Sequence, residues 1–220
     1  MAQAAASLGR ADHVTRTAPE IPRAYNFAAD ILSFNLAAGR ADKLAFIDSR
    51  GSWTYGQLAD RVDRFGAALR ARGIRREDRI FLCMLDNIDW PTAFLGAIKA
   101  GVIPVAVNTL LTESDYEFML TDSRAKLLVV SQALLPKFET ITERCRDLEK
   151  VIVSGGTNDD YEKFEDVIAD AKVPNYLPYT APTTRDDMCF WLYSSGSTGR
   201  PKGTVHSHAS LRLTLSLIHI

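Results

Sequence analysis

The sequence has 220 residues, of which 46% are apolar and 24% are charged, the ordinary range of a globular protein. Its 26 basic and 27 acidic residues leave a formal net charge of -1, so it carries no electrostatic footprint for nucleic acid or an anionic membrane. A chain of this length buries roughly 70% of the surface that its unfolded form exposes, so its core needs no disulfide bonds.

The cysteines and the N-terminal segment bear on the compartment. The three cysteines are far apart, and Cys83 and Cys189 lie in apolar runs typical of small buried side chains. No Cys-x-x-Cys or His-Cys grouping predicts a metal site, and a reducing cytoplasm fits this cysteine usage best. Charges interrupt residues 1–24, which argues against a secretory signal and predicts a flexible lead-in. No run approaches the ~18 apolar residues of a membrane span.

Helical and strand patterns alternate from about Phe27 onward. Apolar residues spaced by three or four predict helices over residues 27–36, 54–72, 113–120 and 132–145, and one between Asn87 and Gly101. Apolar runs predict strands over residues 43–48, 51–54, 79–85, 102–107, 126–130, 150–153 and 188–193, with another beginning at Gly203. This alternation predicts an α/β fold with a layered, mostly parallel β-sheet and flanking helices.

Three local signals refine these elements. Thr54 and Gln57 have the spacing of a capping box, in which each side chain satisfies the other residue's free backbone amide. The pair 86–87 can cap the helix that follows it. Pro104, within the strand 102–107, predicts an edge strand or a bulge because proline has no N–H to donate.

Two breaks divide the chain. Residues 154–160 are turn-forming, and residues 172–187 contain three prolines, which makes the second break the better linker. We therefore expect a first α/β subdomain over residues 25–171, a linker over 172–187, and the start of a second α/β subdomain over 188–220.

The segment after the strand 188–193 is rich in groups that bind anions. It reads Tyr193-Ser-Ser-Gly-Ser-Thr-Gly-Arg-Pro-Lys-Gly203, and the ten residues after Tyr193 hold four hydroxyls, three glycines and two cations. Glycines let backbone N–H groups turn toward an anion, and hydroxyls add further donors. Arg200 and Lys202 add charge, and each charge-assisted bond contributes on the order of 1.5–3 kcal/mol. The loop is predicted to orient a triphosphate.

Other interpretations of this loop fit less well. A solvated linker does not usually lie between an apolar strand and a second strand beginning at Gly203. The Walker A pattern requires Gly-Lys-Ser/Thr, whereas the order here is Pro201-Lys202-Gly203, which argues against a kinase or a GTPase. The dinucleotide fingerprint Gly-x-Gly-x-x-Gly is absent as well.

The loop resembles the phosphate-loop signature of the acyl-adenylate-forming superfamily of AMP-dependent synthetases and ligases. That superfamily contains acyl-CoA synthetases, adenylation domains of peptide synthetases and firefly-type luciferases. Similar segments extend the resemblance over nearly the whole chain from Tyr25: residues 52–58, 93–104 and 205–208. Three further stretches are similar to bacterial benzoate–CoA ligases: residues 89–94, 104–112 and 190–196.

The resemblance implies a fold, a chemistry and a set of site residues. The fold would be part of the large N-terminal domain of an acyl-CoA synthetase. The chemistry would be activation of an aromatic, benzoate-type carboxylate by ATP with Mg²⁺, followed by transfer to coenzyme A. No catalytic residue and no metal ligand is identified in this chain. The residues implied to bind the ATP phosphates are Ser194, Ser195, Gly196, Ser197, Thr198, Gly199, Lys202 and Gly203.

The chain also departs from the superfamily. Members are more than twice as long, and their adenine, acid and coenzyme A pockets lie after the phosphate loop. We therefore expect a truncated fragment that is inactive alone. Residues 211–220 alternate apolar and polar residues where relatives continue into a helix, which suggests a segment out of register with the true sequence. The alternatives are a hydroxybenzoate or fatty acid CoA ligase, or a non-catalytic nucleotide-binding fragment.

Several other residues have simpler interpretations than catalysis. His206 and His208 lack a nearby carboxylate or cysteine in the sequence, so strand-end or helix-cap roles are expected. Asp86 and Asp89 fit the start of a helix, where a negative charge compensates the helix dipole. Packing roles are expected for all three tryptophans, Trp53, Trp90 and Trp191.

Overall fold

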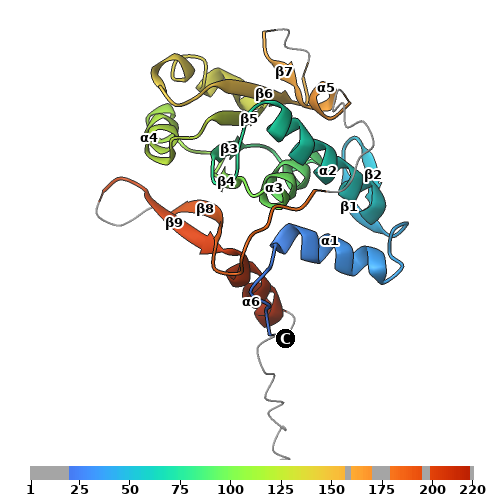
Figure 1. The fold of residues 1–220 in the computed structure, drawn as a ribbon. Coiled ribbons are helices and arrows are strands. Elements are labelled where there is room, and N and C mark those ends of the chain that lie inside the picture. Colours follow the sequence, from blue (N-terminus) through green and yellow to red (C-terminus); the bar gives the residue numbers. More distant parts are fainter. Residues whose placement is uncertain (1–19, 157–159, 170–178, 195–198, 219–220) are drawn as a thin grey trace, which may run out of the picture.

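A seven-stranded sheet forms the centre of the molecule (Figure 1). The computed structural model describes residues 20–156, 160–169, 179–194 and 199–218. The strand order is β7-β6-β5-β3-β4-β8-β9, and every neighbouring pair is parallel except β8 and β9. The strands are β3 (Arg79–Cys83), β4 (Ile103–Ala106), β5 (Leu127–Ser131), β6 (Lys150–Ser154), β7 (Glu162–Lys163), β8 (Met188–Ser194) and β9 (Lys202–Ser207). The predicted mostly parallel sheet is confirmed.

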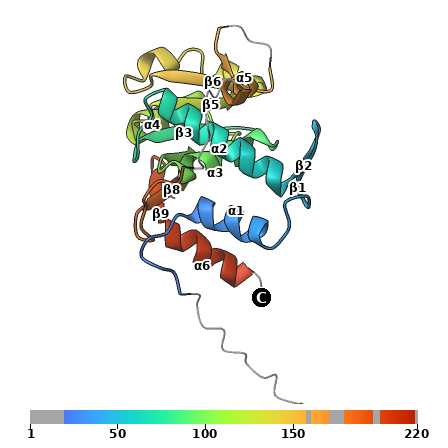
Figure 2. The same ribbon diagram turned by 45° about the vertical axis from the view of Figure 1, so that its right-hand side comes forward.

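Helices cover both faces of the sheet, which gives three layers (Figure 2). One face carries α2 (Tyr55–Ala71), α3 (Asp89–Lys99) and α5 (Phe164–Ala169), and the other carries α4 (Glu113–Ser123) and the 3-10 segments η1 (Gln132–Lys137) and η2 (Thr142–Arg144). Alternate residues of β3 serve the two layers: Ile80 and Leu82 pack on the α2 side, and Phe81 and Cys83 on the α4 side. A strand buried on both faces needs a continuous apolar run, which is the pattern that predicted it.

Four further elements complete the described fold: α1 (Phe27–Ala37), the antiparallel hairpin β1 (Leu44–Asp48) with β2 (Gly51–Thr54), and α6 (His208–Ile218). The predicted capping box starts α2: the Thr54 hydroxyl accepts the Gln57 N–H at 3.2 Å, and the Gln57 side chain accepts the Thr54 N–H at 2.8 Å. The helices α1 and α6 lie side by side, and Ala209 and Leu211 of α6 pack against the buried cluster to which α1 contributes (Figure 1). Among the described residues, no helix is both long and apolar enough to span a bilayer.

Two local predictions are wrong. Residues 132–145 form the 3-10 segments η1 and η2, since Pro136 removes a helical N–H and crowds the preceding turn. The strand with Pro104 is interior, between β3 and β8; it is tolerated because the pairing with β8 begins one residue later, at Val105. Residues 211–218 continue α6 as a helix, and the expectation that this segment is out of register with the true sequence stays a prediction.

Two other segments differ in detail from the predictions. At the start of α3, Asn87 of the predicted 86–87 pair accepts the Asp89 N–H at 2.9 Å, while Asp48 of β1 accepts the Ile88 N–H at 2.8 Å. The short elements β7 and α5 follow the turn 154–160 and were not predicted. The bond from Ile88 to Asp48 joins segments that are 40 residues apart in the sequence, so no local pattern predicts it.

The ends of the first predicted subdomain are joined to the rest. Within the predicted lead-in, Ile21 is buried and its carbonyl accepts a bond from Arg185 at 2.8 Å. Within the predicted linker, the N–H of Ala181 donates to the backbone carbonyl oxygen of Lys99, the last residue of α3, at 2.9 Å. The sheet also continues across the linker, because β4 and β8 are paired. The division into subdomains stays a prediction.

Helices α2 and α3 approach closely at a glycine, which supports a stability prediction. A Cβ at Gly96 would lie 2.9 Å from the Val62 carbonyl oxygen and 3.0 Å from Cδ1 of Phe65. Helix propensity alone would favour alanine by about 1 kcal/mol, but overpacking against a backbone atom costs about 1–3 kcal/mol. We expect Gly96→Ala to destabilise the chain by about 1–2 kcal/mol in urea unfolding.

A control for this prediction is Gly203→Ala, whose Cβ would meet nothing nearer than 3.6 Å. The control should leave the urea midpoint almost unchanged. An unchanged or raised midpoint for Gly96→Ala would show that the two helices have room to separate.

Candidate functional site

The predicted phosphate loop connects the two strands of a hairpin at one edge of the sheet. Its register places Tyr193 opposite Gly203, and Ser194 opposite Lys202. Because β8 runs parallel to β4, the loop leaves the sheet at the carboxyl ends of the parallel strands. The carboxyl ends of the strands are where open α/β sheets bind their ligands.

Four of the eight predicted phosphate-binding residues are described. Ser194 ends β8, Gly199 follows the gap, and Lys202 and Gly203 begin β9. The backbone φ of Gly199 is 147°, a conformation that residues with a side chain rarely adopt. The other four, Ser195, Gly196, Ser197 and Thr198, lie outside the described residues.

A cavity of about 380 Å³ lies beside the described part of this loop. Its wall is mostly apolar, and Asn108 and Tyr193 are its polar members. The lining residues are Trp90, Ala106, Val107, Asn108, Leu111, Met119, Leu192, Tyr193 and Pro201. The carboxyl ends of β4 and β8 and the loop residue Pro201 therefore share one hollow.

Both stems of the loop contact α4. The Tyr193 hydroxyl donates to the Asp122 carboxylate at 2.7 Å. On the other stem, the guanidinium of Arg200 lies 5.2 Å from the centre of the Phe118 ring. Arg200 and Lys202 are exposed. The arrangement brings two cations and glycine backbone to a sheet edge, which is chemistry suited to an anionic ligand.

A sequence model described as "AMP-binding enzyme" matches residues 34–219 of this chain. That match covers most of the sequence, including the phosphate loop. The chain belongs to the AMP-binding enzyme family.

Relatives within the AMP-binding enzyme family are ligases. A benzoate–CoA ligase of Thauera aromatica is 52% identical, over 96% of this chain and 40% of the relative. A 4-hydroxybenzoate–CoA/benzoate–CoA ligase of Rhodopseudomonas palustris is 39% identical, over 87% of this chain and 35% of the relative. The chain thus spans about 35–40% of the length of these relatives.

Solved structures agree with the fold. A benzoate CoA ligase from Burkholderia xenovorans LB400 superposes with a TM-score of 0.75 at 43% identity, covering 88% of this chain and 36% of that chain. An anthranilate CoA ligase in complex with anthranoyl-AMP gives a TM-score of 0.81 at 39% identity, with the same coverage. The expected family and its α/β fold are confirmed.

Magnesium has no assigned ligands: across residues 20–156, 160–169, 179–194 and 199–218, no three His, Cys, Asp or Glu side chains gather as a metal site would require. The three cysteines are free and buried, as the sequence predicted for two of them.

The histidines after the loop have structural partners. His206 stacks on Phe190, with ring centres 4.4 Å apart. His208 is buried at the start of α6, and its Nδ1 accepts the Phe27 N–H of α1 at 3.1 Å. Burial lowers the pKa of His208 to about 4, an effect that Asp187 opposes and Arg76 reinforces. The expected non-catalytic role of His208 therefore takes a specific form: a hydrogen bond between two helices that are 181 residues apart in the sequence.

The buried imidazole of His208 predicts a pH dependence of stability. Between pH 6.5 and 4 the unfolded chain binds a proton that the folded chain does not, so stability is complete above pH 6.5 and falls as pH decreases. The loss over this window is about 3 kcal/mol. Urea unfolding at pH 7 and pH 5 should show a smaller difference for His208→Gln than for wild type, whereas His206→Gln should retain the wild-type difference.

Asp89 has a larger role than the predicted helix start. Its buried carboxylate accepts bonds from Arg61 at 2.5 Å, Arg50 at 2.7 Å and Ser154 at 2.7 Å. These partners are 28 to 65 residues from Asp89 in the sequence, so the sequence offered no local signal for them.

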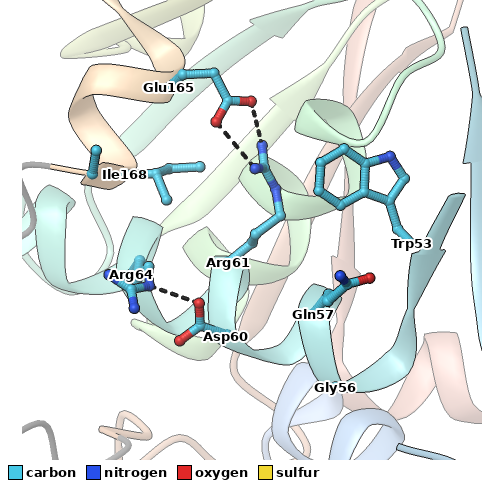
Figure 3. A pocket seen from close by; sticks show the side chains of 9 residues that line it. Trp53, Gly56, Gln57, Asp60, Arg61, Arg64, Glu165 and Ile168 are labelled. Atoms are coloured by element: carbon cyan, nitrogen blue, oxygen red, sulfur yellow. Dashed lines mark hydrogen bonds and ion pairs between the residues drawn. The ribbon is translucent and has the colours of Figure 1, made fainter. Parts of the chain in front are cut away.

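A second cavity, of about 450 Å³, lies beside this ionic cluster (Figure 3). Its charged groups are already paired: Arg61 with Glu165, and Arg64 with Asp60. Trp53 packs its ring 4.9 Å from the Arg61 guanidinium. None of the described residues of the phosphate loop lines this cavity, so the cavity is not assigned to the candidate phosphate site.

Sequence reasoning missed Asp122 and Phe118. Neither belongs to a motif, and Asp122 is 71 residues from the tyrosine that contacts it. Packing roles are supported for Trp53, and for Trp90, which stacks on Phe94 at 5.1 Å. Trp191 packs against the α4-side core, but its buried indole N–H has no hydrogen-bond partner among the described residues.

Proposed function

We propose that this chain is the phosphate-binding part of a longer ligase, called here the parent ligase, which joins a benzoate-type carboxylic acid to coenzyme A. The observation that carries the proposal is the glycine- and hydroxyl-rich loop between β8 and β9, placed at the carboxyl edge of the sheet with Ser194 opposite Lys202. The identity of 52% to a benzoate–CoA ligase supports the acid class.

The reaction has two steps. A carboxylate oxygen attacks the α-phosphorus of ATP, the bond to the bridging oxygen breaks, and acyl-adenylate and pyrophosphate form. The coenzyme A thiol, after losing its proton, then attacks the acyl carbon and displaces AMP. Activation is required because a carboxylate resists attack by a thiolate. The enzyme contributes positioning and charge stabilisation.

In the first step this chain would hold the pyrophosphate end of ATP. Lys202 and Ser194 are paired across the hairpin, and their ammonium and hydroxyl groups would offer donors to phosphate oxygens. The remaining proposed donors are the hydroxyls and amides of residues 195–199. Magnesium would neutralise phosphate charge when bound, and no described residue is assigned to it.

Two other acid classes compete with benzoate. Ligases for hydroxybenzoates are 39% to 32% identical to this chain, and a medium/long-chain fatty acid ligase is 30% identical. Sequence identity to this chain is highest for the benzoate ligase named above and lower for these ligases, which favours benzoate as the acid. The cytoplasm is the proposed location, because three free, buried thiols suit a reducing compartment.

Acid-dependent exchange of radiolabelled pyrophosphate into ATP tests the proposal in the parent ligase. Benzoate should give the fastest exchange in a panel containing hydroxybenzoates, anthranilate and octanoate. Fastest exchange with octanoate would overturn the assignment of an aromatic acid. If no acid in the panel supported exchange, the proposed ligase activity would be refuted. The 220-residue chain alone should form no benzoyl-CoA.

A further inference from the structure

We propose that Asp122 and Phe118 of α4 are positioning residues that hold the two stems of the phosphate loop. The inference rests on the proposed function of that loop. It concerns only described residues: Tyr193 and Arg200 on the hairpin, and their two partners on α4.

The spacing of the partners on α4 supports this role. Phe118 and Asp122 are four residues apart in a continuous helix, so their side chains lie on the same face, one turn apart. Tyr193 immediately precedes the predicted phosphate-binding residues, and Arg200 follows Gly199. One helix face thus contacts the chain just before and just after the loop.

The contact with Tyr193 is directional. Its hydroxyl donates to Asp122 at 2.7 Å and lies 3.4 Å from the carbonyl oxygen of Met119. The bond to a carboxylate is charge-assisted and stronger than one between neutral groups. The half-buried ring also lines the cavity next to Pro201, so the bond fixes a wall of the candidate site.

The contact with Arg200 is of a different kind. The guanidinium lies over the Phe118 ring at 5.2 Å, within the range of a cation–π interaction. Such a contact leaves the charge of the guanidinium available to an anion, because the phenyl ring is uncharged. Phe118 can therefore orient a cation of the loop without neutralising it.

These contacts act on the loop through geometry, and neither Asp122 nor Phe118 is assigned to touch ATP. Loss of the Tyr193–Asp122 bond should release one stem and weaken ATP binding. The expected loss is about 5- to 10-fold in the Kd for ATP, the size for one partly exposed charge-assisted bond.

The test measures ATP binding to the parent ligase by titration calorimetry, with Tyr193→Phe, Asp122→Ala and the double variant. Tyr193→Phe keeps the ring and removes only the hydroxyl. If one bond links the two residues, the double variant binds no more weakly than the weaker single variant. Glu117→Gln is the control, since Glu117 is on the same helix and pairs with Arg144 at 2.8 Å, away from the loop.

A second readout separates positioning from general stability. Turnover of preformed benzoyl-adenylate with coenzyme A does not use the pyrophosphate end of the site, so it should stay within twofold of wild type in all variants. Equal losses in ATP binding and in this step, or additive losses in the double variant, would overturn the inference. So would unchanged ATP binding in Tyr193→Phe.

The outcomes also distinguish this inference from the proposed function. ATP binding that weakens as expected in an enzyme without acid-dependent exchange supports the positioning role and refutes the ligase. Normal acid-dependent exchange with unaltered ATP binding in the variants supports the ligase and refutes the positioning role. Absence of ATP binding in the wild-type parent ligase contradicts both.

Discussion

Replacement of Asp89 by asparagine is expected to lower the free energy of unfolding by about 3–5 kcal/mol. The Asp89 side chain is fully buried, and two guanidinium groups and a serine hydroxyl bond to it. Removing its charge leaves the buried Arg61 and the partly exposed Arg50 with one carboxylate fewer, and a buried cation that loses part of its pairing is costly. Urea unfolding of the 220-residue chain, followed by tryptophan fluorescence, measures the change.

The expected cost is large because the carboxylate joins four elements. Arg50 lies in the turn between β1 and β2, Arg61 on α2, and Ser154 at the end of β6, while Asp89 itself begins α3. Asp60→Asn is the matched control, because its pair with Arg64 at 2.7 Å is exposed and such pairs contribute about 0.3–0.5 kcal/mol. Similar losses for Asp60→Asn and Asp89→Asn would contradict the importance given to burial.

Replacement of Lys202 by alanine is expected to slow formation of the acyl-adenylate by the parent ligase about 10- to 100-fold. The loss corresponds to one charge-assisted interaction with a phosphate oxygen, worth about 1.5–3 kcal/mol. Thioester formation from added benzoyl-adenylate should change little, because pyrophosphate has already left. Quenched-flow measurement of the two steps checks the prediction.

Lys43→Ala is the control for this second prediction, since Lys43 is an exposed lysine just before β1. It should leave both steps unchanged. An equal loss in adenylation and thioester formation for Lys202→Ala would indicate a general disturbance and not the phosphate role assigned to this lysine.

Elements whose causes are local could be predicted from the sequence. The capping box at Thr54 depends on residues three apart, and β3 is an apolar run long enough for one strand. The prediction of a phosphate loop is local in the same way, because its proposed donors are consecutive in the sequence; it stays a prediction.

Features that depend on distant partners could not be predicted. The pairing of β4 with β8 places Pro104 in an interior strand, and nothing near Pro104 indicates that β8 will be its neighbour. The walls of the cavity come from α3, α4 and two strands, and the partner of Tyr193 lies 71 residues earlier in the chain. Residues 211–218 alternate apolar and polar side chains and yet continue a helix, where Leu211 packs against the α1 cluster.

The bond between Phe27 and His208 has a consequence for biosynthesis. Its two ends are 181 residues apart, so at ribosomal rates of 5–20 residues per second the N-terminal helix waits about 10–35 s for its partner. During that interval Phe27 and Ala28, both buried in the finished fold, have no α6 to cover them. The contact of α1 with α6 can therefore form only at the end of this interval, during which chaperones that bind apolar segments can act on α1.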